Sequence, residues 1–244
     1  MNRDAAAREV LLPRRAPELV KPFASSVQAA ETPPERGKAG PKGHWPGKRM
    51  VDVVGVLILL AILSPVIVGV VVCLLRSGGP MVFRHERIGV GGRPFKCYKF
   101  VTMVQNADAV LSELLRTRPD LREEWRRDHK LRNDPRVTPV GAFLRRTSLD
   151  ELPQLWNVLK GDMSLVGPLP IVQEETVKYG SALRHYFAMR PGLTGLWQVS
   201  GRNDTAYRRR VAMDRAYVRH ASFTFDLWIL LRTVGVVLFP RGAY

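Results

Sequence analysis

Two adjacent carboxylates, Asp150 and Glu151, stand just before a strongly helical pattern and are the first candidates for chemistry. Free N–H groups at the start of a helix attract phosphate oxygens, and an Asp held there could attack phosphorus to form an aspartyl-phosphate. Glu151 could help to hold Mg²⁺, which prefers carboxylates together with substrate phosphates. Just upstream, Arg145 and Arg146 would offset the charge that builds up on a transferred phosphoryl group.

The same stretch also has a purely structural interpretation. Ser148 and Glu151 have the spacing of a capping box, and acidic side chains are favoured at a helix start by the helix dipole. Pro153 belongs in the first turn of a helix, so Asp150 itself is a second candidate for the cap. Spacing alone therefore favours capping and leaves phosphoryl transfer as the alternative.

A second polar stretch, residues 190–203, combines three glycines and a proline with Arg, Gln and Asn side chains. Such a loop could line a site for a nucleotide or a sugar, with Arg202 forked onto a phosphate. A well-turned connection without a binding role explains the same residues equally well. The arginines at 208–210 are interpreted as a solvated or lipid-facing helix surface.

The element that could bring these groups to a membrane is the apolar run at residues 53–75. It carries no charge and is long enough, as a helix, to cross the roughly 30 Å hydrocarbon core of a bilayer. Pro65 kinks or breaks a helix there, leaving backbone groups that the Ser64 hydroxyl could satisfy. Basic residues flank both ends, whereas a spanning helix should show asymmetry. The pattern favours a kinked spanning helix, with a re-entrant hairpin as the alternative.

The segments around this run are a tail, an entrance and a hairpin. Residues 1–47 are rich in Pro, Ala, Lys and Arg and predict a disordered tail. Asp52 at the entrance is predicted to form an interfacial ion pair with a neighbouring Lys or Arg. Strands over 81–83 and 95–100 are joined at 89–92, where a hairpin turn is favoured over a phosphate-binding glycine loop.

Helices dominate the rest of the chain. One buried stripe at helical spacing, which Gly161 ends, consists of Leu152, Leu155, Trp156 and Leu159. Further helices are predicted over 171–187 and 204–221. Residues 227–239 are apolar but too short to span a bilayer, so they are expected in the interface or in the core.

The formal net charge of +16 fits nucleic acid, anionic lipid or phosphorylated substrates as partners. The apolar run favours lipid and phosphates, because basic segments beside a membrane bind its anionic leaflet. The sequence has no zinc-finger spacing and no aromatic-studded RNA motif, and its histidines lack ligand-like spacing. Cys73 lies in the apolar run and Cys97 in a predicted strand, so no disulfide framework is expected.

In their order along the chain, these motifs closely resemble the bacterial sugar transferase family, the monotopic polyprenyl-phosphate phosphoglycosyl transferases. The resemblance rests on Lys48-Arg49 with Asp52, Ser64-Pro65, Lys99-Phe100, and the stretches 148–154, 161–168 and 190–203. It extends from about Lys48 to the C-terminus, where residues 241–244 also match. It is greatest for small members that start exopolysaccharide repeat units with galactose or glucose.

The resemblance implies a membrane α/β fold. A re-entrant membrane helix over 48–76 would bend at Ser64-Pro65 and precede a compact, mostly helical cytoplasmic domain over 77–244, with a small β-hairpin and interfacial amphipathic helices. The protein would lie on the cytoplasmic face of the inner membrane, with the anionic leaflet rather than nucleic acid as a partner. The oligomeric state stays open, with a homodimer among the alternatives.

For activity, the resemblance implies Asp150 as the nucleophile and Glu151 as its partner in a dyad that binds Mg²⁺. A sugar-1-phosphate of galactose or glucose would pass from a UDP-sugar to undecaprenyl phosphate through a phospho-aspartate, releasing UMP and initiating exopolysaccharide synthesis. The residues implied to bind the substrates are Arg145, Lys99, Pro168, Pro170, Arg190, Gln198, Arg202 and Asn203.

Two positions depart from the family pattern, because Val101 and Leu169 stand where the family usually has Arg. Each change removes a permanent cation from a site for several phosphates, where a charge-assisted hydrogen bond is worth about 1.5–3 kcal/mol. Either other arginines compensate, or the chain is a catalytically weak or silent homologue that scaffolds polysaccharide assembly. A basic, membrane-tethered nucleic-acid binder is the third and least favoured class.

Overall fold

The computed structural model describes residues 45–128, 131, 133–200 and 207–238, all within one unit of the chain, Gly37–Tyr244. The predicted tail lies outside the described residues except for 45–47. There the Trp45 indole N–H donates to a carboxylate oxygen of Asp226 at 3.0 Å, and its ring packs edge-on against Phe223. The fold therefore includes residues that the sequence assigned to the tail.

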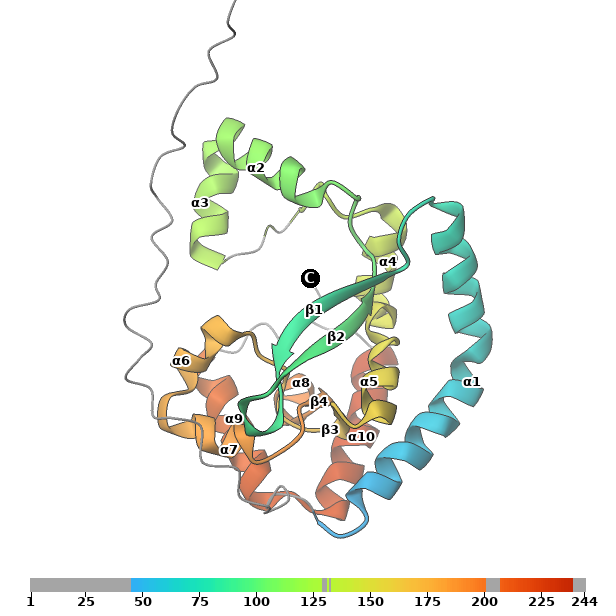
Figure 1. Ribbon diagram of the computed structural model, residues 1–244, viewed down its shortest axis with the longest axis vertical. Coiled ribbons are helices and arrows are strands. Elements are labelled where there is room, and N and C mark those ends of the chain that lie inside the picture. The colour runs from blue at the N-terminus through green and yellow to red at the C-terminus, as the bar shows by residue number, and fades with distance from the viewer. Residues whose placement is uncertain (1–44, 129–130, 132, 201–206, 239–244) are drawn as a thin grey trace, which may run out of the picture. The chain divides into compact units, whose positions relative to one another are not determined.

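The apolar run forms one continuous helix, α1 (Lys48–Arg76), which is long and apolar enough to cross a membrane and contains Pro65. Pro65 cannot donate to the carbonyl of Ala61 one turn earlier. The Ser64 hydroxyl donates to that carbonyl at 2.9 Å and so replaces the missing bond, as the sequence suggested. Figure 1 shows α1 following a bent path, and most of its side chains are exposed.

The N-terminal end of α1 is fixed by buried polar contacts. Lys48 forms an ion pair with Asp226 at 2.5 Å, and Arg49 donates to carbonyls at the end of α5 (Gln154–Lys160). Asp52 accepts hydrogen bonds from the Ser164 hydroxyl and the next backbone N–H, both at 2.9 Å. The predicted ion pair at Asp52 is wrong, because both neighbouring cations bind elsewhere and Asp52 holds a distant strand.

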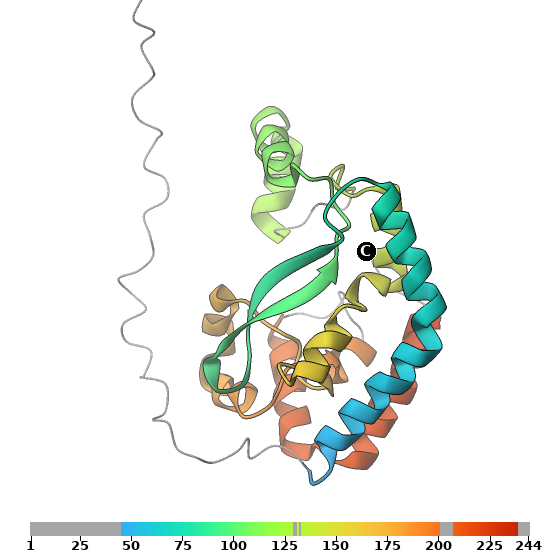
Figure 2. The same cartoon turned by 45° about the vertical axis from the view of Figure 1, so that its right-hand side comes forward.

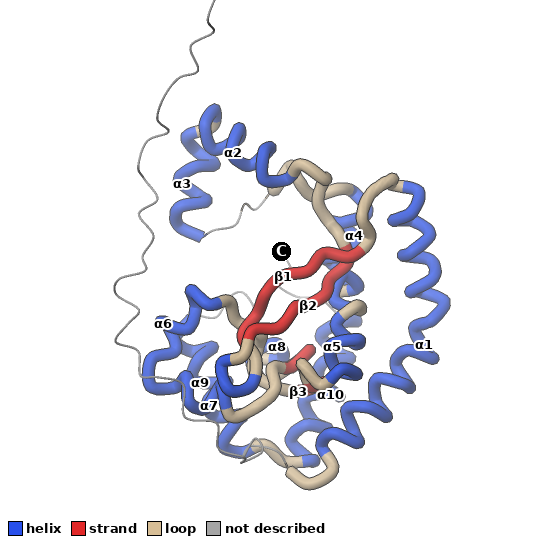
Figure 3. The backbone as a smooth tube through the Cα atoms, in the orientation of Figure 1, coloured by secondary structure: helices blue, strands red, loops and turns tan. Residues whose placement is uncertain are grey.

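The predicted hairpin is confirmed. β1 (Val82–Ile88) and β2 (Pro94–Phe100) pair antiparallel along their whole length and are the two long strands in Figure 3. The connecting 3-10 turn, η2 (Val90–Gly92), places Gly91 and Gly92 at φ 64° and 76°, which other residues rarely adopt. The glycines thus serve the turn, and β1 extends well beyond the strand predicted at 81–83.

A second, short sheet was not predicted. β3 (Ser164–Val166) and β4 (Gly192–Thr194) pair in parallel, and α8 (Leu196–Val199) follows β4. The stretch 190–203 is therefore not a plain loop in its described part. Residues 201–203 of this stretch lie outside the described residues.

The other helices have the following bounds: α2 (Ala107–Thr117), α3 (Pro119–Asp128), α4 (Pro139–Thr147), η3 (Leu149–Glu151), η4 (Gln173–Glu175), α6 (Thr176–Tyr179), η5 (Gly180–Ala182), α7 (Leu183–Phe187), α9 (Tyr207–His220) and α10 (Phe223–Leu238). The single helix predicted over 171–187 is wrong, since the chain there forms short pieces around Gly180 at φ 47°. The predicted helix at 204–221 is confirmed from residue 207 onward.

The main core forms where α5, the short sheet, α9 and α10 meet. Leu155 and Val158 of α5 are buried, and Gly161 ends the helix at φ 89°, as predicted. Trp156, however, is 57% exposed, so the predicted stripe is rotated toward Val158. Figure 2 shows α10 on the same side of the domain as α1, and Ile229 of α10 joins the core.

Candidate active site

The chain enters the candidate site through a strained turn. After α4, Ser148 adopts φ 57°, the only positive φ among described residues other than glycine, and the next three residues form η3. Ser148 makes no side-chain capping bond, and the α5 N-cap, Pro153, makes none either. The predicted capping box is therefore wrong. Asp150 and Glu151 project from a 3-10 turn without a capping role.

Lys99 of β2 reaches both carboxylates. Its ammonium donates to Glu151 Oε1 at 2.7 Å and lies 3.8 Å from Asp150 Oδ2. Burial alone would lower the pKa of Lys99, but attraction to Glu151 and Asp150 outweighs it and raises this pKa above its ordinary value. The hairpin thus supplies a permanent cation to η3.

Asp150 is the more enclosed member of the pair, with 13% of its side chain exposed against 36% for Glu151. Burial raises the pKa of Asp150 to about 6, and the neighbouring Glu151 carboxylate adds to this effect. Lys99 and Arg145 act in the opposite direction. Asp150 is consequently a carboxylate that is poorly solvated and incompletely neutralised, which is the state expected of a nucleophile.

Arg145 is oriented by a residue that sequence reasoning missed. The Arg145 Nε donates to the Thr102 hydroxyl at 2.9 Å, across 43 positions of sequence. Thr102 follows β2 directly after Val101, so its place beside the Lys-Phe motif was the available signal. This bond fixes the guanidinium near Asp150, whose pKa it acts to lower.

Asp150 and Glu151 could hold Mg²⁺ with help from a substrate. The described residues contain no group of three His, Cys, Asp or Glu side chains placed to bind a metal. Mg²⁺ commonly takes one or two protein carboxylates and completes its shell with phosphate oxygens and water. Two adjacent carboxylates therefore fit a magnesium ion that arrives with a phosphorylated substrate.

Several other residues predicted to bind substrates form hydrogen bonds within the fold instead of lying beside Asp150. Pro168 is buried and its carbonyl accepts from Gly192 N–H at 2.8 Å, while the Pro170 carbonyl accepts from an arginine of β1 at 3.4 Å. The Arg190 Nε donates to the Gly161 carbonyl at 2.8 Å, which joins the chain just before β4 to the C-cap of α5. No described hydrogen bond or ion pair links any of these residues to Asp150.

Three predicted binding residues remain: Gln198, Arg202 and Asn203. Both amide atoms of Gln198 are buried and find no hydrogen-bond partner among the described residues. Buried amides in this state usually bind water, a ligand or a neighbouring segment. Arg202 and Asn203 lie outside the described residues, so their predicted roles stay predictions.

The three consecutive arginines predicted as a solvated surface divide into two kinds. Arg208 and Arg209 are exposed, but Arg210 is buried. The Arg210 guanidinium lies 3.4 Å from Glu175 and stacks over the ring of Trp197, 5.4 Å from its centroid. The prediction is therefore wrong for Arg210, because the third arginine faces the interior of the helix packing.

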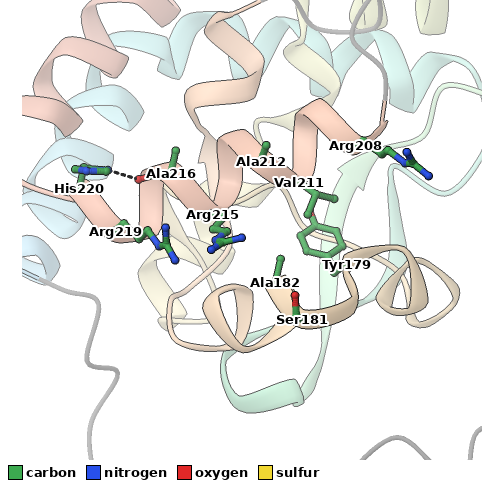
Figure 4. Close-up of a pocket in the computed structure, with 10 residues that line it drawn as sticks. All are labelled: Tyr179, Ser181, Ala182, Arg208, Val211, Ala212, Arg215, Ala216, Arg219 and His220. Carbon is green, nitrogen blue, oxygen red and sulfur yellow. Dashed lines mark hydrogen bonds between the residues drawn. The ribbon is translucent and has the colours of Figure 1, made fainter.

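A groove with a volume of about 460 Å³ runs along α9. Figure 4 shows Arg215 directed toward Ser181 and Ala182 on its other wall, with the small residues Ala212 and Ala216 between the arginines. None of the predicted catalytic or binding residues lines it. The groove is basic and separate from the carboxylates of η3.

The two departures from the family pattern lie in rigid surroundings. Val101 is half-buried at the end of β2, where its N–H donates to the Met81 carbonyl at 2.9 Å. It stands between Lys99 and Thr102, the residues that contact the carboxylates and Arg145. Leu169 is half-buried between two buried prolines. Val101 is therefore next to the candidate site along the chain, and no described contact connects Leu169 to it.

Comparison with known proteins gives a single family. A family model described as bacterial sugar transferase matches residues 43–240. The chain is 52% identical over 197 residues to a protein of Erwinia amylovora named UDP-galactose-lipid carrier transferase, covering 81% of this chain and 41% of that protein. It thus spans about two-fifths of the length of several curated relatives that it matches.

Other relatives are closer to it in length. The exopolysaccharide production protein ExoY of Rhizobium meliloti is 48% identical over 213 residues, which cover 87% of this chain and 94% of that protein. A protein of Caulobacter vibrioides named UDP-glucose:undecaprenyl-phosphate glucose-1-phosphate transferase is 41% identical over 206 residues, covering 81% of this chain and 72% of that protein.

Proposed function

Because this chain belongs to the bacterial sugar transferase family, we propose that it transfers a sugar-1-phosphate from a UDP-sugar to undecaprenyl phosphate. Several relatives have galactose or glucose in their names, which suggests one of these hexoses as the sugar. The name of another relative suggests exopolysaccharide synthesis as the pathway. The observation that carries the proposal is the state of Asp150: its side chain is largely but not fully buried, its pKa is raised, and it lies near both Lys99 and Arg145.

In the proposed reaction, an Asp150 carboxylate oxygen attacks the β-phosphorus of the UDP-sugar. The bond from this phosphorus to the bridging oxygen breaks, UMP leaves, and the sugar phosphate remains bonded to Asp150. A phosphate oxygen of undecaprenyl phosphate then attacks the same phosphorus and releases the Asp150 carboxylate. The product is undecaprenyl diphosphate carrying the sugar, and no proton has to be gained or lost.

The residues around Asp150 would have separate roles in stabilising the negative charge of the phosphates. Lys99 and Arg145 neutralise charge on the phosphoryl oxygens as the bond to the bridging oxygen breaks. Glu151 holds the Lys99 ammonium in place through the 2.7 Å bond and, with Asp150, would bind Mg²⁺. When bound, Mg²⁺ would supply further neutralisation of the phosphates and help to orient them.

Membrane association is proposed from α1 and α10. The two helices expose large apolar side chains, among them Met50, Leu57, Ile62, Leu231 and Leu238. An exposed apolar surface of this kind indicates contact with lipid, and the basic composition fits the anionic cytoplasmic leaflet of the inner membrane. A homodimer stays a prediction, and nucleic acid is not proposed as a partner.

A re-entrant path is proposed for α1 from the packing of its two ends. A straight helix of 29 residues is about 43 Å long, enough to put its ends on opposite sides of a bilayer. Both ends nevertheless pack on the same domain: Asp52 binds β3, while Val70 and Leu74 join a cluster with Leu144 of α4. This supports a helix that enters and leaves by the cytoplasmic face.

Cysteine labelling from the periplasm tests this path. In a Cys73→Ser background, Pro46→Cys and Ser77→Cys place thiols at exposed positions beside the two ends of α1. These positions are preferable to Gly47 and Gly78, whose positive φ disfavours any other residue. We expect both thiols to be protected from a membrane-impermeant reagent in intact cells. Labelling of either one would contradict the re-entrant path.

UMP release tests the activity. The purified chain is mixed with undecaprenyl phosphate, Mg²⁺ and one member of a panel of UDP-sugars. We expect UMP with UDP-galactose or UDP-glucose. The alternative, a catalytically silent scaffold, is favoured by Val101 and Leu169 alone. It would be supported if no UDP-sugar released UMP while the folded chain still bound its polysaccharide-assembly partners.

A further inference from the structure

A small apolar groove separates the second half of α1 from α4 and η3. Its volume is about 230 Å³, and its lining residues are Val66, Gly69, Val70, Cys73, Val140, Phe143, Leu144 and Leu149. The lining surface is almost entirely apolar. Two of its lining residues, Val66 of α1 and Phe143 of α4, are 40% and 50% exposed, so the groove is open to the outside.

We propose that this groove binds the isoprene units nearest the phosphate of the polyprenyl-phosphate acceptor. The inference rests on the proposed function, because it assigns a place to one of the two substrates of that reaction. Its first support is continuity with the candidate active site. Leu149 lines the groove and is followed directly by Asp150, so a chain lying in the groove would carry its head group to the nucleophile.

Next to the lining residues of α4 along the chain stands a charge that fits a phosphate head group. Phe143 and Leu144 of α4 face the groove, and the next residue, Arg145, is held by Thr102 beside Asp150. The change from apolar lining to a guanidinium occurs within a single residue step. An apolar chain ending in a phosphate matches this order of side chains.

The chemistry of the lining favours an isoprenoid over a peptide. An extended peptide would bring N–H and C=O groups into a groove whose lining offers them no hydrogen-bonding partner, which is strongly unfavourable in lipid. A polyprenyl chain has no polar groups to satisfy. The groove therefore suits a hydrocarbon that enters sideways from the bilayer.

Gly69 contributes the open space on the α1 side. A Cβ built at Gly69 meets no atom within 4 Å, and its φ is not positive, so neither close packing nor backbone strain requires glycine. Glycine is less favourable than Ala inside a helix. At Gly69 the open space belongs to the groove and leaves room for a ligand. Gly235 of α10 has the same open surroundings outside the groove and supplies a matched control.

The first experiment compares Gly69→Leu with Gly235→Leu. Initial rates are measured against undecaprenyl phosphate in vesicles and, separately, against the UDP-sugar. We expect Gly69→Leu to raise the KM for undecaprenyl phosphate about tenfold or more, with the KM for the UDP-sugar unchanged, and Gly69→Ala to have a smaller effect. Gly235→Leu should alter neither. An unchanged acceptor KM in a folded Gly69→Leu chain would overturn the inference, as would an equal rise in both leucine variants.

The second experiment does not depend on turnover. Cys73 lines the groove and is exposed, whereas the other cysteine, Cys97, is buried. In Asp150→Asn, undecaprenyl phosphate added to phosphatidylcholine vesicles should slow maleimide labelling of Cys73, and a UDP-sugar should not. Equal labelling with and without undecaprenyl phosphate would mean that bilayer acyl chains or nothing fills the groove.

The two experiments separate failure of the groove from failure of the proposed reaction. Protection of Cys73 in the absence of any UMP release from the parent chain would support the groove and count against the reaction. UMP release from the parent with an unprotected Cys73 and a normal Gly69→Leu would do the opposite.

Discussion

Two lysine–aspartate pairs in this protein show how burial and pairing separate structure from chemistry. Asp226 accepts three hydrogen bonds, from Lys48, Tyr217 and Trp45, at 2.5–3.0 Å. Asp150 has Lys99 only at 3.8 Å, although it too is largely enclosed. A buried carboxylate with several hydrogen-bond donors is stabilised in place. One whose nearest cation lies farther away keeps oxygen lone pairs free to act as a nucleophile.

The difference extends to what each pair connects. Lys48 and Asp226 join the first described helix to the last, so their interaction holds the fold together. Lys99 and Asp150 join a hairpin to a turn of three residues, and the shorter contact of Lys99 is with Glu151 rather than with Asp150. We therefore expect changes in the Asp226 pair to act on stability and changes in the Asp150 pair to act on activity.

The largest effect is expected for Asp150→Asn. The amide keeps the shape of the side chain but cannot form the phosphoryl bond, so transfer should fall by about a thousandfold or more. UMP release measured on the purified variant checks this. Asp120→Asn, in an exposed ion pair with Arg118, is the control and should keep full activity. Near-normal turnover in Asp150→Asn would remove Asp150 from the chemistry.

Asp226→Ala should act on stability instead. Removing the carboxylate leaves the Lys48 ammonium buried and uncompensated, which typically costs about 3–5 kcal/mol of unfolding free energy. Denaturation in detergent, followed by circular dichroism, measures the loss. The double variant Lys48→Met with Asp226→Leu should recover most of it, because the charge is gone as well. If Asp226→Ala unfolds at the parental midpoint, the comparison between the two pairs fails.

The rate of the first half-reaction should depend on pH through Asp150. Its pKa is raised to about 6, so the nucleophilic carboxylate is present above that pH and is lost below it. We expect single-turnover UMP release without acceptor to fall about tenfold per pH unit below pH 6. Leaving out undecaprenyl phosphate removes its own titration from the profile. A rate that stays flat down to pH 4.5 would contradict the raised pKa.

The raised pKa of Asp150 also predicts that Asp150→Asn stabilises the protein, whereas Asp226→Ala destabilises it. A carboxyl group whose pKa rises on folding is destabilising above that pKa, and the penalty disappears below the unfolded value of 3.8. Asp150→Asn should therefore stabilise the protein at pH 8 by up to about 3 kcal/mol, and hardly at all near pH 3.5. Unfolding midpoints at the two pH values decide it.

The smallest expected effect is that of restoring the family's arginines. Val101→Arg with Leu169→Arg should raise transfer about tenfold, or about 1.4 kcal/mol in the barrier, if new cations reach the phosphates. Initial rates of the single and double variants measure it. Because Val101 adjoins the site along the chain, its single variant should account for most of the gain. No gain, or a loss through repulsion with Arg145, would show that the existing cations suffice.

Local patterns in the sequence predicted the elements whose cause is local. The glycines of the hairpin turn and Gly161 at the end of α5 were identified correctly, because a positive φ is a property of a single position. Ser64 was identified as the group that satisfies the backbone around Pro65 for the same reason. Features that depend only on neighbouring residues along the chain can therefore be predicted from the sequence.

Misleading patterns arose where distant partners decide the outcome. Capping-box spacing at Ser148 and Glu151 was overridden because Lys99, in another element, binds Glu151. The ion pair expected at Asp52 gave way to a pair between residues 178 positions apart. The raised pKa of Asp150 could not be predicted at all, since it depends on burial by the hairpin and α4. The family resemblance predicted Asp150 and Glu151 together with Lys99 and Arg145, but not Thr102, which orients Arg145.

The packing of α1 means that this apolar helix cannot be removed without damage to the fold. A fragment starting after Arg76 would lose the lysine that neutralises Asp226, the carboxylate that holds β3, and Val56, which is fully buried in the main core. Such a fragment would expose the core it was meant to isolate. Solubility would have to come from detergent or from polar substitutions on the outer face of α1, with its inner face left intact.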